Sequence, residues 1–379
     1  MKIAFLTHGE SIHEYRFLSK MVEYGHEPYL ISYDGNNLVE VEGVKVYKYD
    51  YRKLYSFNRI ITSLLPFQIA KKVLVFLVAH HFKKLLKEIK PDILHTHFIH
   101  YQGFCGALSG FKPTIAMTVG SDILLFPERS FFDNFAAKYT LKKADRIVCD
   151  CQTVRQKIID LSHCSSQKID IILGGADLNI FNADVSGNEI KERFGLNNKK
   201  VLIMNRKFQP VYGVEYFIEA LPFIIKKASK VFALLIGEGA TKSDCQKRVK
   251  EMGLEDHVIF VGDVSEKEMA KYLNAADVYV STSLSDGASA SLLEALACGL
   301  PVVVTDIPAN REWIKDGVNG FLVPPRNPEK TAEAILKLLN DGERMKIFGQ
   351  YNQKIAQNKA DWDKEYQKLD KIYNQLVQK

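Results

Sequence analysis

Asp286 and Glu294 lie eight residues apart in the stretch LSDGASASLLEALACGLPVVVTD, where a loop of small residues runs into an apolar helical pattern. Eight residues of helix span about 12 Å, so the two carboxylates cannot grip one atom but can reach two ends of one ligand. A simpler interpretation is that Ser289 or Ser291 caps the helix and that Glu294 is a solvated charge near its positive end. This stretch alone leaves both interpretations open.

The start of the same helix is a candidate anion site. If residues 288–291 open the helix, their free N–H groups and the helix dipole favour a phosphate there. Carboxylates repel a phosphate but accept hydrogen bonds from hydroxyls, so a ligand with hydroxyls at both ends and a diphosphate between them fits. A nucleotide sugar has this form. Arg206 and Lys207 follow a predicted strand in NRKFQPVYGV and could supply the cations, although either alone is more often a surface residue.

Two runs of strands and helices must position these residues. The opening KIAFLTHGESIHEYRFLSKMVEYGHEPYLIS predicts a strand, a turn at Gly9, an amphipathic helix and a second strand. Further strands are expected at 92–97, 114–119, 146–150 and 169–173, and the pattern restarts with strands at 200–205, 231–237, 257–262, 277–281 and 301–306. Helices are expected at 214–227, 243–252, 267–275 and 289–298. This alternation predicts an α/β protein of two doubly wound, Rossmann-like domains, with ligands beyond the carboxyl ends of the strands, in the cleft between them.

The composition fits two such domains. The 379 residues, 46% hydrophobic and 25% charged, are too many for one ordinary core. Polar residues appear too close to the N-terminus for the apolar region of a signal peptide. No stretch of eighteen residues is both apolar and without a charged side chain. The six cysteines show neither C-x-x-C spacing nor the density of a secreted scaffold. We therefore expect a cytoplasmic protein that does not span a membrane.

Glycine spacing argues against several cofactor classes. The first strand–helix turn contains only Gly9, whereas a dinucleotide fingerprint needs three spaced glycines, so a nicotinamide or flavin enzyme is disfavoured. The segment GEGA at 237–240 is too short to count alone, and no Walker loop or aspartate-rich metal motif is present. We therefore expect no cofactor and no metal.

The stretch 51–90 is strongly basic, with nine Lys or Arg residues against one acidic residue, although the net charge of the chain is only +6. It includes LLPFQIAKKVLVFLVAHHF, which is typical of a segment lying on an anionic membrane surface. A helix of the domain with a basic outer face is an equally good interpretation. Nucleic acid is not expected as a partner, because no recognisable binding module is present.

Four segments in the second half of the chain form a recognisable series: ILGGADLNIFN, NRKFQPVYGVEYFIEAL, VIFVGDVSEKEMAKYLNAADVYVSTS and DGASASLLEALACGLPVVVTDIPANREWIKDGVNGFLVPP. They are similar to the interdomain linker, the diphosphate loop, the base-binding region and the acidic pair of one enzyme family. On these segments the chain resembles the family-4 retaining glycosyltransferases, of glycosyltransferase group 1. The resemblance implies the GT-B fold, with an acceptor-binding domain at 1–178 completed by a C-terminal helix at about 357–379. A nucleotide-sugar-binding domain at 179–356 would face it across a cleft.

The resemblance also assigns roles to individual residues. It implies a donor site in which Arg206 and Lys207 bind the diphosphate, Glu294 binds the ribose and Asp286 binds the donor sugar. The backbone contributes the remaining expected donor contacts, at Gly9, Gly237, Val264, Gly287, Ala288 and Ser289.

Three positions depart from the family pattern. Asp286 stands where the family usually has Glu, and Tyr212 stands where a Lys commonly precedes the glycine, so Lys207 is the candidate for the second cation. In AMTVGSDIL, Val119 stands where the family has a histidine. The nearest polar candidates for a catalytic role are then Asp122 and His97.

The implied reaction is transfer of a sugar, with retention at the anomeric carbon, from a UDP- or GDP-sugar to an acceptor hydroxyl. Arg206, Lys207 and the helix amides near Ser289 would stabilise the departing diphosphate. The expected partners are the donor and a glycan or lipid-linked acceptor of cell-envelope glycan, polysaccharide or glycolipid synthesis, with contact to an anionic membrane at its inner face. Two alternatives remain: a nucleotide-sugar 2-epimerase-like enzyme of the same fold, and a non-catalytic sugar-binding subunit.

Overall fold

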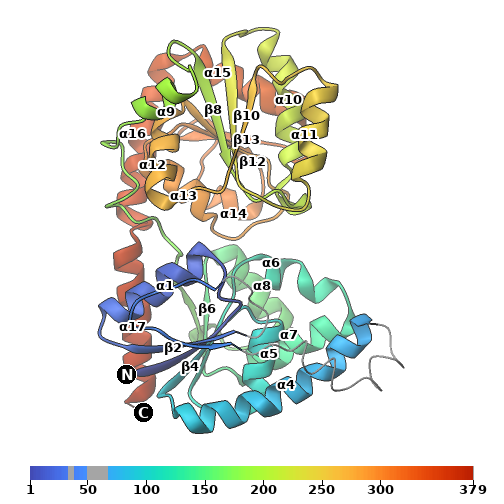
Figure 1. The fold of residues 1–379 in the computed structure, drawn as a ribbon, viewed down its shortest axis with the longest axis vertical. Helices are drawn as coiled ribbons and strands as arrows, with labels where there is room; N and C mark the ends of the chain where they lie inside the picture. Colours follow the sequence, from blue (N-terminus) through green and yellow to red (C-terminus); the bar gives the residue numbers. More distant parts are fainter. Residues whose placement is uncertain (33–37, 49–66, 379) are drawn as a thin grey trace. The chain divides into compact units, whose positions relative to one another are not determined.

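The computed structural model describes residues 1–32, 38–48 and 67–378, and side chains within the helix that begins at Phe67 are described from Val75 onward. The chain forms two compact units, Met1–Ile172 with Tyr366–Lys379, and Leu173–Glu365 (Figure 1). The sequence placed the boundaries after residues 178 and 356. The first crossing between units thus comes six residues earlier, and the second nine residues later, than expected.

Unit 1 is built on a parallel sheet of seven strands in the order β3-β2-β1-β4-β5-β6-β7. The strands are β1 Lys2–Leu6, β2 Glu27–Ser32, β3 Lys45–Lys48, β4 Ile93–His97, β5 Thr114–Met117, β6 Arg146–Cys149 and β7 Ile169–Ile171. The helices are α1 Ile12–Glu23, α4 Phe67–Ile89, α5 Tyr101–Ser109, α6 Ser121–Leu124, α7 Phe131–Lys143 and α8 Gln152–Ser162, joined by the last part of α17 Trp362–Val377. Short 3₁₀ turns lie at Phe126–Glu128 and Ser166–Lys168.

Both faces of this sheet are covered. Alternate residues of β1 point to opposite faces: Ala4 and Leu6 pack with α4 and α5, whereas Phe5 packs against Phe17 of α1. On the face of Phe5, His95 of β4 contacts Tyr373 of α17. This burial on two sides explains the continuous apolar runs of the central strands.

Unit 2 repeats the plan with six parallel strands in the order β10-β9-β8-β11-β12-β13. The strands are β8 Lys200–Asn205, β9 Val231–Ile236, β10 Val258–Gly262, β11 Val278–Ser281, β12 Val302–Thr305 and β13 Gly320–Val323. The helices are α9 Asn188–Arg193, α10 Val214–Ile225, α11 Lys242–Glu251, α12 Glu266–Ala275, α13 Ala290–Ala297, α14 Pro308–Arg311, α15 Pro328–Leu339 and α16 Gly342–Lys359, with a 3₁₀ turn at Pro210–Tyr212. Two apolar clusters, one on each face, form its core.

The strand order in each unit reverses at one point. In unit 1 the chain moves outward from β1 through β2 to β3 and then returns to place β4 on the other side of β1. In unit 2 it moves outward from β8 to β10 and returns to place β11 beside β8. The loops that leave two such neighbouring strands diverge, and this is where open α/β sheets bind ligands. The prediction of two doubly wound parallel sheets is confirmed.

Candidate functional site

Arg206 is the first residue after β8, at the point where the strand order of unit 2 reverses. Its Nη1 donates to the Ser289 Oγ at 2.6 Å and to the Ser291 Oγ at 2.9 Å, and its Nη2 forms an ion pair with Asp286. The Tyr212 ring lies against the guanidinium, with its centroid 4.0 Å from Cζ. Only 9% of the Arg206 side chain is exposed. The cation is therefore held between the loop after β8 and the start of α13.

The loops after β8 and β11 are joined to each other across this point. Gly213 has φ +56, and a Cβ there would lie 2.6 Å from the Thr282 carbonyl oxygen, so only glycine permits the approach. The Thr282 Oγ1 donates to the Gly213 oxygen at 2.7 Å, and the Leu284 N–H donates to the Val211 oxygen at 2.8 Å. These contacts place Tyr212 and Arg206 beside the α13 start.

Helix α13 begins as the sequence predicts. Ser289 is its N-cap, and the Ser289 Oγ accepts from the Leu292 N–H at 3.4 Å. The first-turn N–H groups have no acceptor within the helix, which favours an anion at this end. The Ser291 hydroxyl lies 3.0 Å from the Ser289 Oγ and 3.1 Å from the Tyr279 hydroxyl. The α13 start and Arg206 thus belong to one hydrogen-bonded network.

The carboxylates of Asp286 and Glu294 are both shielded from solvent. Burial raises the pKa of Asp286, while Arg206 and the Gly287 N–H, which donates to its Oδ1 at 3.1 Å, act in the opposite direction. Glu294 lies in the second turn of α13 and is 8% exposed. The interpretation of Glu294 as a solvated surface charge is therefore wrong.

The remaining predicted donor residues of unit 2 lie along the same edge of the sheet. Gly237, directly after β9, has φ +133, and a Cβ there would lie 2.6 Å from the Arg206 carbonyl oxygen. Val264 is half-buried in the loop after β10, and Lys207 is exposed beside Arg206. Gly287 and Ala288 lead into α13. The carboxyl ends of four neighbouring strands thus bring the predicted residues together, and the role of each remains a prediction.

The predicted residues of unit 1 lie in its interior. The Gly9 N–H donates to the Glu14 Oε1 at 3.0 Å. His97 is buried in β4, and burial lowers the pKa of its imidazole to about 4, so the ring is neutral at neutral pH. Burial also disfavours the charged form of Asp122, and for this carboxyl group it raises the pKa, to about 6. The Asp122 carboxylate accepts from the N–H groups of Ile99 at 3.0 Å and Val119 at 2.9 Å. Asp122 joins two loops, and a catalytic role for it or for His97 stays a prediction.

Two family models match the chain and together span most of it. Residues 186–355 match glycosyl transferases group 1, and residues 2–151 match the glycosyl transferase 4-like family. The chain belongs to the group 1 glycosyltransferases. The recognition made from the sequence is confirmed.

This group 1 glycosyltransferase has relatives among archaea and bacteria. It is 28% identical over 253 residues to an uncharacterised glycosyltransferase of Methanocaldococcus jannaschii, a match that covers 65% of the chain and 62% of the relative. The UDP-Gal:alpha-D-GlcNAc-diphosphoundecaprenol alpha-1,3-galactosyltransferase of Escherichia coli is 28% identical over 274 residues, 68% of the chain and 69% of the relative. The chain therefore matches less than two thirds of the length of the first of these proteins.

The fold of this glycosyltransferase is also found in solved structures. Alr3699/HepE of Anabaena, solved in complex with UDP-glucose, superimposes with a TM-score of 0.80 at 19% identity, covering 99% of the chain and 100% of the neighbour. At this identity the likeness concerns the fold alone. The predicted GT-B fold class, with two Rossmann-like domains, is confirmed.

Glu14 is a buried carboxylate of the glycosyltransferase that was not predicted from the sequence. Its carboxylate accepts from the Thr7 hydroxyl and from the N–H groups of Gly9 and Ser11. Burial acts to raise its pKa, but His97 and the hydrogen bonds outweigh this and lower the pKa of Glu14 to about 2. The capping-box spacing S-x-x-E in SIHE could have revealed it.

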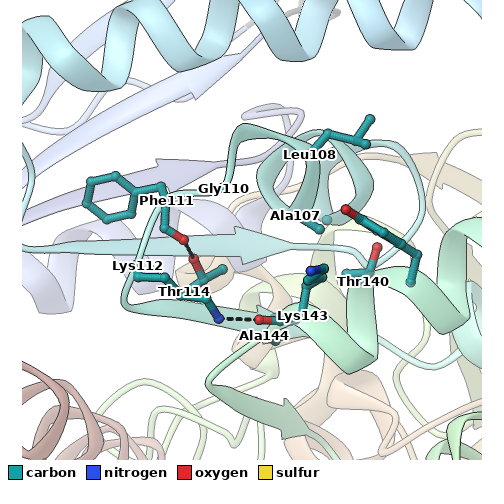
Figure 2. Close-up of a pocket in the computed structure, with 12 residues that line it drawn as sticks. Ala107, Leu108, Gly110, Phe111, Lys112, Thr114, Thr140, Lys143 and Ala144 are labelled. Atoms are coloured by element: carbon teal, nitrogen blue, oxygen red, sulfur yellow. Dashed lines mark hydrogen bonds between the residues drawn. The ribbon is translucent and has the colours of Figure 1, made fainter.

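A cavity of about 200 Å³ in unit 1 lies between α5, β5 and α7, and none of the residues described above lines it (Figure 2). It opens beside Thr114 at the amino end of β5, the opposite edge from the loops described above. The threonine hydroxyls that line it are already bonded: Thr114 donates to the Phe111 oxygen and Thr140 to the Ala136 oxygen, each at 2.8 Å. The cavity presents no carboxylate, histidine or cysteine among its lining residues, so we assign it no chemistry.

Two further features of the glycosyltransferase concern only the part of the chain described. Within residues 1–32, 38–48 and 67–378, no three His, Cys, Asp or Glu side chains gather where they could hold a metal ion. Over the same ranges no helix has the length and apolar character needed to cross a membrane. The expectation that no metal takes part remains a prediction.

Proposed function

We propose that the chain transfers a sugar from a nucleoside diphosphate sugar to an acceptor hydroxyl, with retention at the anomeric carbon. One observation carries the proposal: a shielded arginine, the start of α13 and two shielded carboxylates meet where the strand order of unit 2 reverses. The cation and the helix amides suit a diphosphate, and the carboxylates suit hydroxyls.

The chemical task is to stabilise negative charge that grows on the diphosphate as the glycosidic bond breaks. Arg206 and the first-turn amides of α13 are fixed before the reaction, and such preorganised donors contribute several kcal/mol, roughly 3–4 for one well-placed donor. Glu294 accepts from the ribose hydroxyls and Asp286 from the donor sugar. Lys207 adds a second cation from the exposed side of the loop. This arrangement needs neither a metal nor another cofactor.

The donor is proposed to be a UDP-sugar, with a GDP-sugar as the next candidate. The Anabaena neighbour was solved with UDP-glucose, and the Escherichia coli relative is named for UDP-Gal. Both names support a uridine donor for this chain.

Retention is compatible with the acceptor attacking from the side that the diphosphate leaves. A phosphate oxygen can then take the acceptor proton, so no separate general base is required. This suits a chain in which Val119 replaces the family histidine and both Asp122 and His97 are buried.

The acceptor is proposed to be a glycan or a sugar carried on a lipid, reached at the cytoplasmic face of an anionic membrane. The name of the Escherichia coli relative gives a diphosphoundecaprenol-linked acceptor. Much of the basic stretch 51–90 lies outside the described residues, and its described part consists of α4 and Lys90, which follows it.

An aromatic patch on unit 1, formed by Phe76, Phe131 and Phe135, supports the membrane contact. Phe131 is 89% exposed, and Phe76 and Phe135 both pack against Phe104, with ring centroids at 6.0 and 6.1 Å. The exposed Lys83 and Lys87 follow Phe76 on the same helix at intervals of seven and eleven residues, which place them on one face. Exposed aromatic rings beside lysines suit an anionic lipid surface.

Sedimentation with vesicles tests this contact. The protein should sediment with phosphatidylglycerol vesicles at low salt and be released as salt rises, because screening weakens the attraction. Phe131→Ser should reduce the bound fraction, whereas Phe223→Ser, at an exposed phenylalanine of unit 2, should not. No binding at low salt would exclude the membrane contact but not the reaction.

The reaction is tested by screening UDP- and GDP-sugars by thermal shift, followed by product analysis with and without acceptors. A donor that binds the folded chain should raise the melting temperature. The proposal is supported if an α-linked donor sugar is transferred to the acceptor and the new glycosidic bond is also α. Release of a free epimerised sugar without acceptor would identify the epimerase alternative, and binding without turnover would favour the non-catalytic subunit.

A further inference from the structure

Arg206 has an anionic partner within the chain itself. Its Nη2 is paired with Asp286, and its Nη1 donates to Ser289 and Ser291. Asp286 is 17% exposed and Arg206 9%, so this pair is largely shielded from water. Shielded, charge-assisted hydrogen bonds are stronger than those on an open surface.

Resting on the proposed function, we infer that Asp286 is a latch: it occupies Arg206 in the unliganded protein and must leave when a diphosphate binds there. The carboxylate and the diphosphate are both anions, so they compete for the same guanidinium and repel each other. Tyr212, Ser289 and Ser291 are uncharged and can stay in contact with Arg206 when the anion changes.

The latch makes the site distinguish a nucleotide sugar from a bare nucleoside diphosphate. Once Asp286 leaves Arg206, it is a shielded carboxylate that needs new hydrogen-bond donors, because an unpaired buried charge is costly. The hydroxyls of a donor sugar can supply them. A nucleoside diphosphate has no sugar at that end, so the Asp286 Oδ2, which had accepted from Arg206, is left without a donor, although Oδ1 keeps the Gly287 N–H. Return of Asp286 to Arg206 therefore favours release of the product.

The test compares UDP with UDP-glucose, and GDP with GDP-mannose, by calorimetry on the full chain. Asp286→Asn removes the competing charge and frees Arg206, so the affinity for the nucleoside diphosphate should rise by about tenfold, as expected when a state populated at roughly one tenth becomes dominant. The affinity for the nucleotide sugar should rise less than that for the nucleoside diphosphate, or fall, because an Asn side chain accepts hydrogen bonds from sugar hydroxyls less well than a carboxylate does. The preference for donor over product should therefore shrink.

Two variants serve as controls. Asp170→Asn makes the same change in a partly buried Asp of unit 1, whose Oδ2 accepts from the Arg146 Nε at 2.8 Å, and it should leave both affinities unchanged. Asp286→Glu keeps the charge and should not strengthen binding of the nucleoside diphosphate.

Loss of an ion pair can also destabilise the chain, so melting temperatures are measured with each ligand. UDP should raise the melting temperature of Asp286→Asn more than that of the unaltered protein. If Asp286→Asn does not fold, Asp286→Ala provides the same comparison. Unchanged or weaker UDP binding in a folded variant would overturn the latch while leaving the nucleotide site intact. If the unaltered protein binds no UDP, GDP or derived sugar, the proposed function fails, and the latch with it.

Discussion

At the scale of single residues, Arg206 and Lys207 are neighbours in sequence with different surroundings. Arg206 is shielded and has its guanidinium fixed by an ion pair, two hydroxyls and an aromatic ring. Lys207 is exposed on the same loop. Electrostatic stabilisation depends on a charge that is preorganised and shielded from water. The two cations should therefore contribute unequally to turnover.

Arg206→Ala is expected to lower kcat by about 10²–10³-fold with a smaller change in KM, because the diphosphate charge grows as the bond breaks. Lys207→Ala should lower kcat by no more than about tenfold, since an exposed cation is screened by solvent. Steady-state kinetics with a saturating acceptor measures both, and circular dichroism checks folding. An equal loss in the two variants would mean that Lys207 turns to the diphosphate on binding.

Single residues were predictable where position along the chain was enough. Arg206 directly follows a strand, and Asp286 and Glu294 flank a helix start, so local pattern placed all three at a ligand-binding edge. The Arg206–Asp286 ion pair joins residues 80 positions apart, and side-chain packing across the sheet decides it. The same holds for Tyr279, which reaches the site only because β11 lies beside β8.

At the scale of elements, the strands of both sheets were predicted except for two edge strands, β3 and β13. β8 has the expected bounds, and the other predicted strands differ at their ends by one or two residues. β3, with sequence KVYK, is exposed along its length, so it lacks the apolar run that marks a buried strand. β13, with sequence GFLV, is short and begins with glycine, which disfavours a strand from sequence alone. Both lie at sheet edges.

The start of α1 depends on the Glu14 carboxylate, which serves the N-cap and the loop after β1 together. Glu14→Gln should lower the free energy of unfolding at pH 7 by about 1–2 kcal/mol, because hydrogen bonds to the carboxylate help to lower its pKa from an ordinary 4.5 to about 2 in the folded state. The part of this pKa shift that comes from His97 is not counted, since that ring is neutral at pH 7. A carboxylate whose pKa is lower in the folded than in the unfolded protein stabilises the fold at pH values above its unfolded-state pKa. This stabilisation is lost as the pH falls toward the folded-state pKa. The difference between the two proteins should therefore be full above about pH 5 and vanish toward pH 2.

Urea unfolding at pH 7, 5 and 3 measures this dependence. Glu23→Gln is the matched control, because Glu23 lies on the same helix, is exposed and pairs with Lys20 at 2.7 Å. It should change stability by less than about 0.5 kcal/mol at each pH. A constant loss for Glu14→Gln from pH 7 to 3 would show that the side chain acts through packing and not through its charge.

At the scale of the whole molecule, the chain passes between the two units twice, near residues 173 and 365. Helix α17 runs through the second crossing without a break. Its Trp362, Tyr366, Leu369 and Tyr373, spaced for one helical face, are all buried, as their spacing predicts. The exact crossing point was not predictable, because α16 and α17 both have helical patterns and are separated by only two residues.

The two crossing segments are bonded to each other within unit 2. The Ala176 N–H donates to the Ala360 oxygen at 2.7 Å, and the Trp362 N–H donates to the Ala176 oxygen at 3.1 Å. Gly175 has φ +52, and a Cβ there would lie 2.8 Å from the Trp362 Cα. Backbone atoms cannot rotate away as a side chain can. The close approach of the crossings therefore requires glycine at this position.

Gly175→Ala should lower the free energy of unfolding by about 2–4 kcal/mol. Alanine is strained in the left-handed backbone conformation of this position, and its Cβ would also overlap with the backbone of α17. Gly174→Ala is a control one residue away, because no atom lies within 4 Å of a Cβ there and its φ is not positive. It should be neutral or slightly stabilising, since alanine restricts the unfolded chain. Urea unfolding of both variants, followed by tryptophan fluorescence that includes the buried Trp362, makes the comparison. Equal stability of the two variants would mean that the crossings can separate without cost, and that α17 is held by its contacts with unit 1 alone.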